Sequence, residues 1–184
     1  MKWHLVASAS RRLSSSDQAH EAGKMPALHT AGGQSLIPAP ILIIGIGNPS
    51  RGDDALGPLL IERLEALQLP DVELLTDFQL QVEYALDLRG RREVVFVDAS
   101  LDAPAPFTFA PVVALEDASY SSHELSPGAV LHVYHKLFGE PPPAFVLALR
   151  GERFELGEGL SEAASAHLEA ALDFIAQRFS DTCP

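Results

Sequence analysis

The segment Ile41–Gly57, with the sequence ILIIGIGNPSRGDDALG, constrains the fold of this chain more than any other. Its apolar run Ile41–Ile44 is typical of a parallel strand that is buried on both faces. Gly45 and Gly47 then let the chain turn sharply at the end of that strand, and a helical pattern follows Pro58. A strand, a glycine-rich turn and a helix place the turn at the carboxyl end of a sheet, where α/β folds hold their functional groups.

Two adjacent carboxylates, Asp53 and Asp54, indicate what this turn binds. A phosphate-binding turn offers backbone N–H groups and avoids nearby anions, whereas two carboxylates repel a pyrophosphate and attract a cation. The dinucleotide pattern G-x-G-x-x-G also fails, because Ser50 occupies the position of the third glycine. The turn therefore predicts a cation site rather than a nucleotide site.

Strand and helix patterns alternate along the rest of the chain. We predict further strands at residues 72–75, 93–99, 107–113 and 144–149, and helices at residues 59–67, 82–88, 126–138 and 161–179. The prolines that flank 107–113 favour an edge position for that strand. Alternating strands and helices predict an α/β fold, a three-layer sandwich in which helices flank a mostly parallel twisted sheet in a single domain.

Composition separates the chain into a tail and an acidic domain. Residues 1–39 are rich in Ser, Ala, His and Gly and have no sustained apolar period, so we predict a disordered N-terminal tail. The domain is expected at 40–180, followed by a short C-terminal tail at 181–184. The chain carries a net charge of −12; its first forty residues contribute +2 and the remainder −14. An acidic domain argues against binding of nucleic acid or of an anionic membrane surface.

The single cysteine, Cys183, indicates the compartment. One cysteine forms no intramolecular disulfide and no thiolate metal cluster, which fits a reducing cytosol, so a cytoplasmic location is expected. No window reaches the roughly 18 apolar residues of a membrane span.

Three polar side chains are placed where a parallel sheet would gather them. Asp54 follows the first strand, Asp98 ends the third, and His123 lies in the loop after the fourth. Two carboxylates and an imidazole can hold a divalent transition metal and leave positions open for substrate or water. Taken singly, an Asp at a strand end is usually a turn former or helix cap, and a loop His is usually solvated. Residue types alone leave both interpretations open.

Candidate substrate-binding residues lie nearby. They are Asn48 in the glycine turn, and Asp77 and Gln79 after the second strand. For Asp77 we favour orientation of a loop or capping of the next helix over a metal role. Gln79 either contacts a peptide backbone or is only polar surface. Arg51 is expected to form a surface ion pair with a neighbouring aspartate rather than to recognise a substrate carboxylate.

Four segments of the chain resemble the hydrogenase maturation endopeptidases in kind, order and spacing. They are GIGNPSRGDDALGP at 45–58, TDFQLQVEYALDL at 76–88, VVFVDAS at 94–100 and SSHELSPGAVL at 121–131. The resemblance covers residues 41–179 and is greatest to the branch that processes cytoplasmic or multisubunit nickel–iron hydrogenases. It implies a single α/β domain that removes a C-terminal extension from the hydrogenase large subunit precursor after nickel insertion.

The resemblance also implies residue roles. Asp54, Asp98 and His123 would contact nickel that arrives with the precursor, and Asp54 and Asp98 would be catalytic in an aspartic-type peptidase. The best-known family pattern has Glu at the first position, so Asp54 is one methylene shorter. No Ser or Cys nucleophile with a paired base is evident, so water is the attacking group. Either carboxylate would act as general base, or the metal would polarise the scissile carbonyl.

Two other functions compete with the endopeptidase. Peptidyl-tRNA hydrolases open with a similar strand and Gly-x-Gly-Asn-Pro turn, but that family continues with a Tyr and a His-Asn pair and has a basic face for tRNA. Here 51–54 reads Arg-Gly-Asp-Asp. The other alternative is a non-catalytic nucleotide- or metal-binding module, in which Asp77 would bind the ribose of a degenerate dinucleotide fold.

Overall fold

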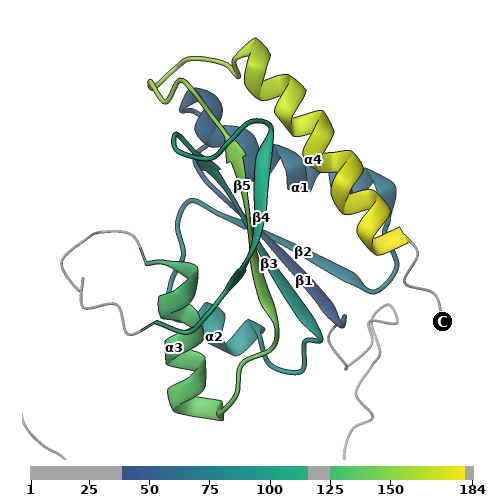
Figure 1. Cartoon of the computed structure of the whole chain (residues 1–184), viewed down its shortest axis with the longest axis vertical. Helices are drawn as coiled ribbons and strands as arrows, with labels where there is room; N and C mark the ends of the chain where they lie inside the picture. Colours follow the sequence, from purple (N-terminus) through teal and green to yellow (C-terminus); the bar gives the residue numbers. More distant parts are fainter. Residues whose placement is uncertain (1–38, 116–124, 181–184) are drawn as a thin grey trace, which may run out of the picture. The chain divides into compact units, whose positions relative to one another are not determined.

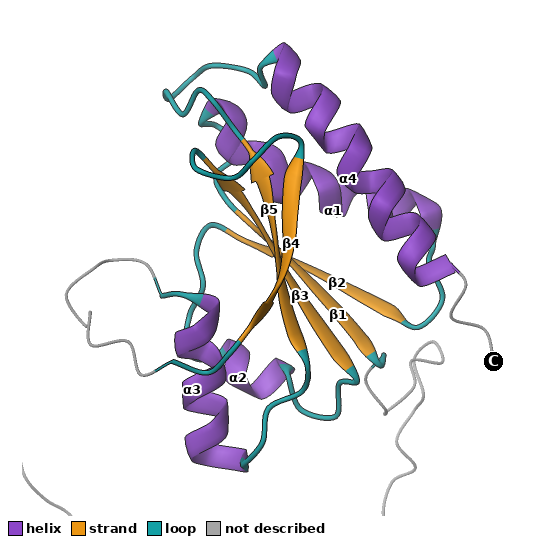
Figure 2. Cartoon of the chain, in the orientation of Figure 1, coloured by secondary structure: helices purple, strands orange, loops and turns teal. Residues whose placement is uncertain are grey.

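The fold is built around a twisted five-stranded sheet with helices on both faces (Figures 1 and 2). The structure is a computed structural model, and it describes residues 39–115 and 125–180. The strands are β1 Ile41–Ile46, β2 Val72–Asp77, β3 Glu93–Ser100, β4 Phe107–Val112 and β5 Ala144–Arg150. The helices are α1 Leu56–Leu67, α2 Tyr84–Asp87, α3 Pro127–Phe138 and α4 Glu162–Ser180, with a 3-10 turn η1 at Gly52–Ala55.

The sheet has the strand order β2-β1-β3-β5-β4. The first four strands in this order run parallel, and β4 lies antiparallel to β5 at one edge. β1 is fully buried, as its continuous apolar run predicted, because it has a neighbouring strand on each side and helices on both faces. The predicted α/β sandwich with a mostly parallel sheet, and the edge position of β4, are confirmed.

Two apolar cores lie on opposite faces of the sheet. Alternate residues of β1 divide between them: Ile41 and Ile43 pack with α1 and α4, and Leu42 and Ile44 pack with α2 and α3. Figure 1 shows these two helix pairs on the two faces. The three layers therefore follow from the period-2 alternation of side chains along a strand.

The helix ends largely match the capping signals in the sequence. The Ser126 hydroxyl accepts the Ala129 N–H at the start of α3, and the Ser161 hydroxyl accepts the Ala164 N–H at the start of α4. α1 ends before Pro70, because Gln68 adopts a left-handed conformation with φ 49°. α2 is shorter than the predicted 82–88, since turns flank its single helical turn.

Several predictions fall on residues outside the described ranges. They are the predicted tail at 1–39 apart from its last residue, the segment at 181–184, Cys183 and the proposed ligand His123. Among the residues that are described, no helix is both long enough and apolar enough to cross a membrane.

Candidate functional site

Close backbone approach shapes the turn after β1. A Cβ on Gly57 would lie 2.2 Å from the Ile46 carbonyl oxygen, and a Cβ on Gly45 would lie 2.6 Å from the Gly57 carbonyl oxygen. Gly45 is thus a packing position inside β1, and the prediction that it turns the chain is wrong. Gly47 makes the turn, with φ 138°, and its missing Cβ leaves room for the Asp54 carbonyl. The start of α1 is thereby pressed against the end of β1.

Asp53 is fully buried and holds together distant parts of the chain. Its carboxylate accepts the N–H groups of Glu152 (2.8 Å), Arg153 (3.0 Å) and Ser161 (2.7 Å) and the Ser161 hydroxyl (2.9 Å). Burial raises the pKa of Asp53, but these four hydrogen bonds to the ionised form outweigh it and hold the pKa below its usual value. Asp53 is therefore an ionised structural anchor.

The segment 151–161, which we call the strap, is bound to the glycine turn along its length. Gly52 N donates to Glu158 O at 3.1 Å, Asp53 N to Arg153 O at 2.7 Å, and Gly157 N to Ser50 O at 2.8 Å. A Cβ on Gly52 would lie 2.5 Å from the Arg153 oxygen, so the strap fits only against glycine there. The strap thus fixes the turn through backbone hydrogen bonds.

Arg51 binds the strap instead of a carboxylate. Its Nε donates to the Phe154 carbonyl oxygen at 3.3 Å. No ion pair joins Arg51 to Asp53 or Asp54, all three of which the structure describes, so the expected surface ion pair is wrong. The physical reason is that four other donors surround Asp53, while Asp54 turns to the other side.

Asp54 and Asp98 line the same cavity at the carboxyl ends of the strands. Asp54 Oδ2 accepts the Asn48 N–H at 3.1 Å, and Asp98 Oδ1 accepts the Ala99 N–H at 2.8 Å. Both side chains are half-buried. One carboxylate from the turn after β1 and one from β3 are thus brought together by neighbouring parallel strands, as the sequence predicted.

The cavity has a volume of about 760 Å³ and a mixed polar and apolar lining. It is lined by Ile46, Gly47, Asn48, Arg51, Asp54, Phe78, Gln79, Leu80, Asp98, Ala99, Leu101, Leu125, Ser126, Pro127 and Phe154. Its walls come from the glycine turn, the ends of β2 and β3, the start of α3 and the strap. A space of this size, open to solvent and holding two carboxylates, is large enough for a segment of polypeptide.

The three substrate-binding candidates are placed differently. Asn48 and Gln79 line the cavity. Asp77 accepts the Phe78 N–H at 2.7 Å and the Tyr84 hydroxyl at 2.8 Å, which orients the loop between β2 and α2 as we favoured. Burial and the Asp77 carboxylate raise the pKa of Tyr84, so that this phenol stays protonated.

A complete metal-ligand set is not formed by the described residues. Among them, no group of three His, Cys, Asp or Glu side chains is arranged to hold a metal ion. The third predicted ligand, His123, lies outside these residues. Carboxylate oxygens are suitable ligands for a divalent ion, and Asp54 and Asp98 line the same cavity; their role as metal ligands stays a prediction.

The strap was missed by sequence reasoning. It contributes Phe154 to the cavity and provides the donors to Asp53. Residues 151–160 carry no strand or helix in the structure and no metal-ligand pattern in the sequence. Ser161 is predictable from the sequence as a helix cap, but that pattern gives no indication of its bond to Asp53.

Comparisons with known proteins point to one group. No protein-family model matches the chain, and no curated protein matches it by sequence. Among solved structures, the chain is similar to the [NiFe] hydrogenase maturation protease HycI from Thermococcus kodakarensis KOD1. The two share 28% sequence identity at a TM-score of 0.64, and the match covers 78% of this chain and 94% of that one.

Two Escherichia coli structures give the same result. The hydrogenase maturating endopeptidase HybD is 26% identical, with a TM-score of 0.59, over 75% of this chain and 90% of that one. A further endopeptidase, known from a solution structure, is 28% identical, with a TM-score of 0.60, over 74% and 90% of the respective chains. The resemblance to hydrogenase maturation proteases that the four sequence segments predicted is confirmed.

Proposed function

We propose that this protein is an endopeptidase that removes the C-terminal extension of a nickel–iron hydrogenase large subunit precursor after nickel insertion. The observation that carries the proposal is the placement of Asp54 and Asp98 in one open cavity. Support comes from similarity to proteins named as hydrogenase maturation proteases or endopeptidases at 26% and 28% identity. The site of action would be the cytoplasm.

Nickel belongs to the substrate in this proposal. The precursor would bring its nickel to Asp54, Asp98 and His123, and these residues would recognise the loaded state. Nickel accepts carboxylate and imidazole ligands, and Asp54 and Asp98 supply two carboxylates to the cavity. Metal contact requires neutral His123, so recognition depends on pH.

Cleavage would proceed by attack of water on the scissile carbonyl. Asp54 accepts a hydrogen bond from the Asn48 N–H and Asp98 accepts one from the Ala99 N–H, so backbone donors help to orient both carboxylates. Either carboxylate can take a proton from water as general base, which contributes typically 10²–10⁴-fold to a rate. Asn48 and Gln79 can hold the peptide backbone across the cavity.

The alternative functions lack support from the comparisons. The carboxylates of Asp54 and Asp98 line the cavity beside the glycine turn and would repel the phosphates of a dinucleotide or of tRNA.

The decisive experiment compares nickel-loaded and nickel-free precursor as substrates, with mass measurement of the product. We expect cleavage of the loaded form only. Asp98→Asn should slow cleavage by roughly 100-fold or more. Asp102→Asn, an exposed aspartate in the loop after β3 that is not part of the cavity lining, is the matched control and should cleave normally. Failure of the wild-type protein to cleave either form would refute the proposed function.

A further inference from the structure

The two edge strands of the sheet, β2 and β4, differ in whether a proline blocks their outward backbone groups. An edge strand presents unpaired N–H and C=O groups, and proteins often block such an edge with proline. β4 carries Pro111, and the hydrogen bond from Arg150 N to Pro106 O sets the antiparallel pattern so that Pro111 faces outward. β2 contains no proline. The β2 edge is therefore the one that can accept another strand.

The hydrogen bonds to β1 show which groups of β2 face outward. Ile41 N donates to Asp71 O and Gly47 N donates to Asp77 O, both at 3.1 Å. Since successive residues of a strand alternate in direction, the odd-numbered residues bond to β1. The backbone groups of Val72, Leu74 and Thr76 point away from it, and no hydrogen bond between described residues uses their N–H groups.

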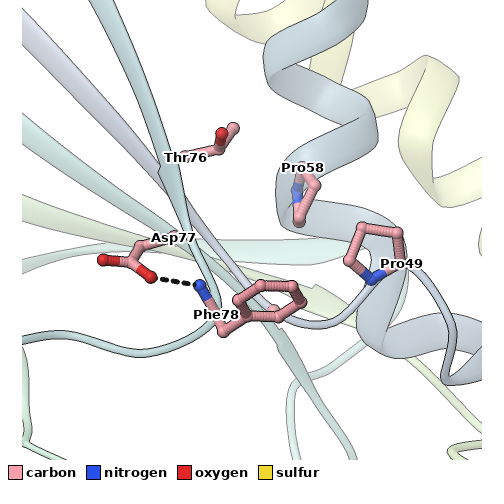
Figure 3. A pocket seen from close by; sticks show the side chains of 6 residues that line it. Pro49, Pro58, Thr76, Asp77 and Phe78 are labelled. Carbon is pink, nitrogen blue, oxygen red and sulfur yellow. Dashed lines mark hydrogen bonds between the residues drawn. The ribbon is translucent and has the colours of Figure 1, made fainter.

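A small apolar pocket lies at the carboxyl end of this edge. It has a volume of about 170 Å³, which is enough for one aliphatic side chain. Figure 3 shows Pro49, Pro58, Thr76 and the Phe78 ring around it, with the Asp77 carboxylate pointing away. The lining that a bound side chain would meet is thus mostly apolar.

The pocket adjoins the cavity that holds Asp54 and Asp98. Gly47 and Phe78 line both spaces, and Phe78 is 67% exposed. A second groove, of about 340 Å³, lies at the other end of β2, with Glu65 and Glu73 among its lining residues. The Glu73 carboxylate forms an ion pair with Arg91 at 2.7 Å, so Glu65 is the carboxylate that a basic group of a ligand would meet. An edge strand between an apolar pocket and a groove that Glu65 lines, continuous with the proposed active site, fits an extended peptide.

We propose that an extended stretch of the cleaved precursor adds to the sheet along β2. Its backbone would pair with Leu74 and Thr76, and an aliphatic side chain would enter the pocket beside Phe78. A basic side chain further along would lie near Glu65. This proposal rests on the proposed function, since it assigns the surface that holds the same substrate next to the carboxylates.

Amide hydrogen exchange tests the pairing directly. The full-length Asp98→Asn protein, in which cleavage is expected to be slowed by roughly 100-fold or more, is mixed with nickel-loaded precursor at a concentration at which complex formation is verified by size-exclusion chromatography. We expect exchange of the Leu74 and Thr76 amides to slow by about tenfold or more, because they would become hydrogen-bonded. Unchanged exchange of both amides, or slowing confined to β4, would overturn the proposal.

Substitution of Thr76 tests the consequence for cleavage. Thr76→Pro removes the outward N–H without touching a bond to β1, and we expect KM to rise about tenfold with little change in kcat. Thr76→Val keeps the N–H and loses only the hydroxyl, so its KM should lie at least fivefold below that of the proline variant. Thermal melting of both variants checks that they fold.

The outcomes separate the two proposals. If the wild-type protein cleaves the precursor and the proline variant has an unchanged KM, docking along β2 is wrong and the endopeptidase stands. If the wild-type protein cleaves neither form of the precursor, the proposed function and the docking proposal both fail.

Discussion

Replacing Asp53 by Asn should destabilise the fold far more than the same change at Asp54. Asp53 is fully buried, and its Oδ1 accepts one backbone N–H while its Oδ2 accepts two more and the Ser161 hydroxyl. The amide of Asn keeps one acceptor oxygen and gains an NH₂ group. The Ser161 hydroxyl can rotate to avoid the new NH₂ group, but the backbone N–H groups of Glu152, Arg153 and Ser161 cannot. In either orientation of the substituted amide, at least one backbone N–H therefore points at the NH₂ group and loses its acceptor.

The size of this destabilisation follows from the free-energy cost of a buried N–H group that has lost its acceptor. A hydrogen bond to a charged acceptor contributes about 1.5–3 kcal/mol, and an unsatisfied buried donor costs about 1–3 kcal/mol. We therefore expect the free energy of unfolding to fall by about 3 kcal/mol, a large part of the ~5–15 kcal/mol of a typical domain. For a domain of this size the melting temperature should fall by roughly 6–12 °C.

The effect of Asp53 on stability should depend on pH. Its pKa in the folded protein lies below the ordinary value of 3.8, because the hydrogen bonds to the ionised form outweigh burial. A lowered pKa adds stability above about pH 4, and that stability is lost as the pH falls through the folded pKa. The difference between wild type and Asp53→Asn should therefore be constant from pH 7 to pH 5 and shrink below pH 4.

Urea unfolding at pH 7, 5 and 3 measures these differences. Asp54→Asn is the matched control, because its amide oxygen can still accept the single Asn48 N–H. It should lose no more than about 1 kcal/mol. An Asp53→Asn protein within 1 kcal/mol of wild type at pH 7, or equal losses for the two variants, would refute the structural role of Asp53.

Other predictions address the site and the packing. Cleavage should fall below about pH 6 as His123 becomes protonated, and His123→Ala should abolish it in a folded protein; full activity at pH 5 would argue against a His ligand. Gly57→Ala should cost about 2 kcal/mol or more in urea unfolding, because its Cβ would lie 2.2 Å from a carbonyl oxygen, whereas Gly159→Ala, with nothing within 4 Å, should be near neutral. Tyr84→Phe should lose about 1 kcal/mol with the bond to Asp77. Because folding raises the pKa of Tyr84, the stability advantage of the wild type over the variant should shrink above about pH 10.

The sequence predicted the parts of the fold that depend on local pattern. The run at Ile41–Ile44 could be identified as a central strand because a parallel strand covered on both faces needs continuous apolar residues. The edge position of β4 followed from its prolines, and the starts of α3 and α4 from Ser126 and Ser161. From the alternation of strands and helices it also followed that Asp54 and Asp98 would meet at one end of the sheet.

What the sequence could not predict depends on contacts between distant residues. Asp53 and Ser161 are 108 positions apart, and no local rule relates them. The strap has no periodicity, so its attachment to the turn through Gly52 and Gly157 was not visible. Gly45 was interpreted as a turn former because the partner that requires its small size, α1, is known only from the packing.

Asp53 and Asp54 show why adjacent identical residues can differ in role. They lie in the 3-10 turn Gly52–Ala55, where each residue is rotated by about 120° from the one before. One side chain is thereby directed to the strap and α4, and the next to the cavity. Four hydrogen bonds already compensate the charge of Asp53, so the turn presents the charge of one carboxylate to the cavity, not two as the sequence suggested. Any affinity of this turn for a cation therefore depends on Asp54, and Asp53→Asn should weaken it only to the extent that the turn moves.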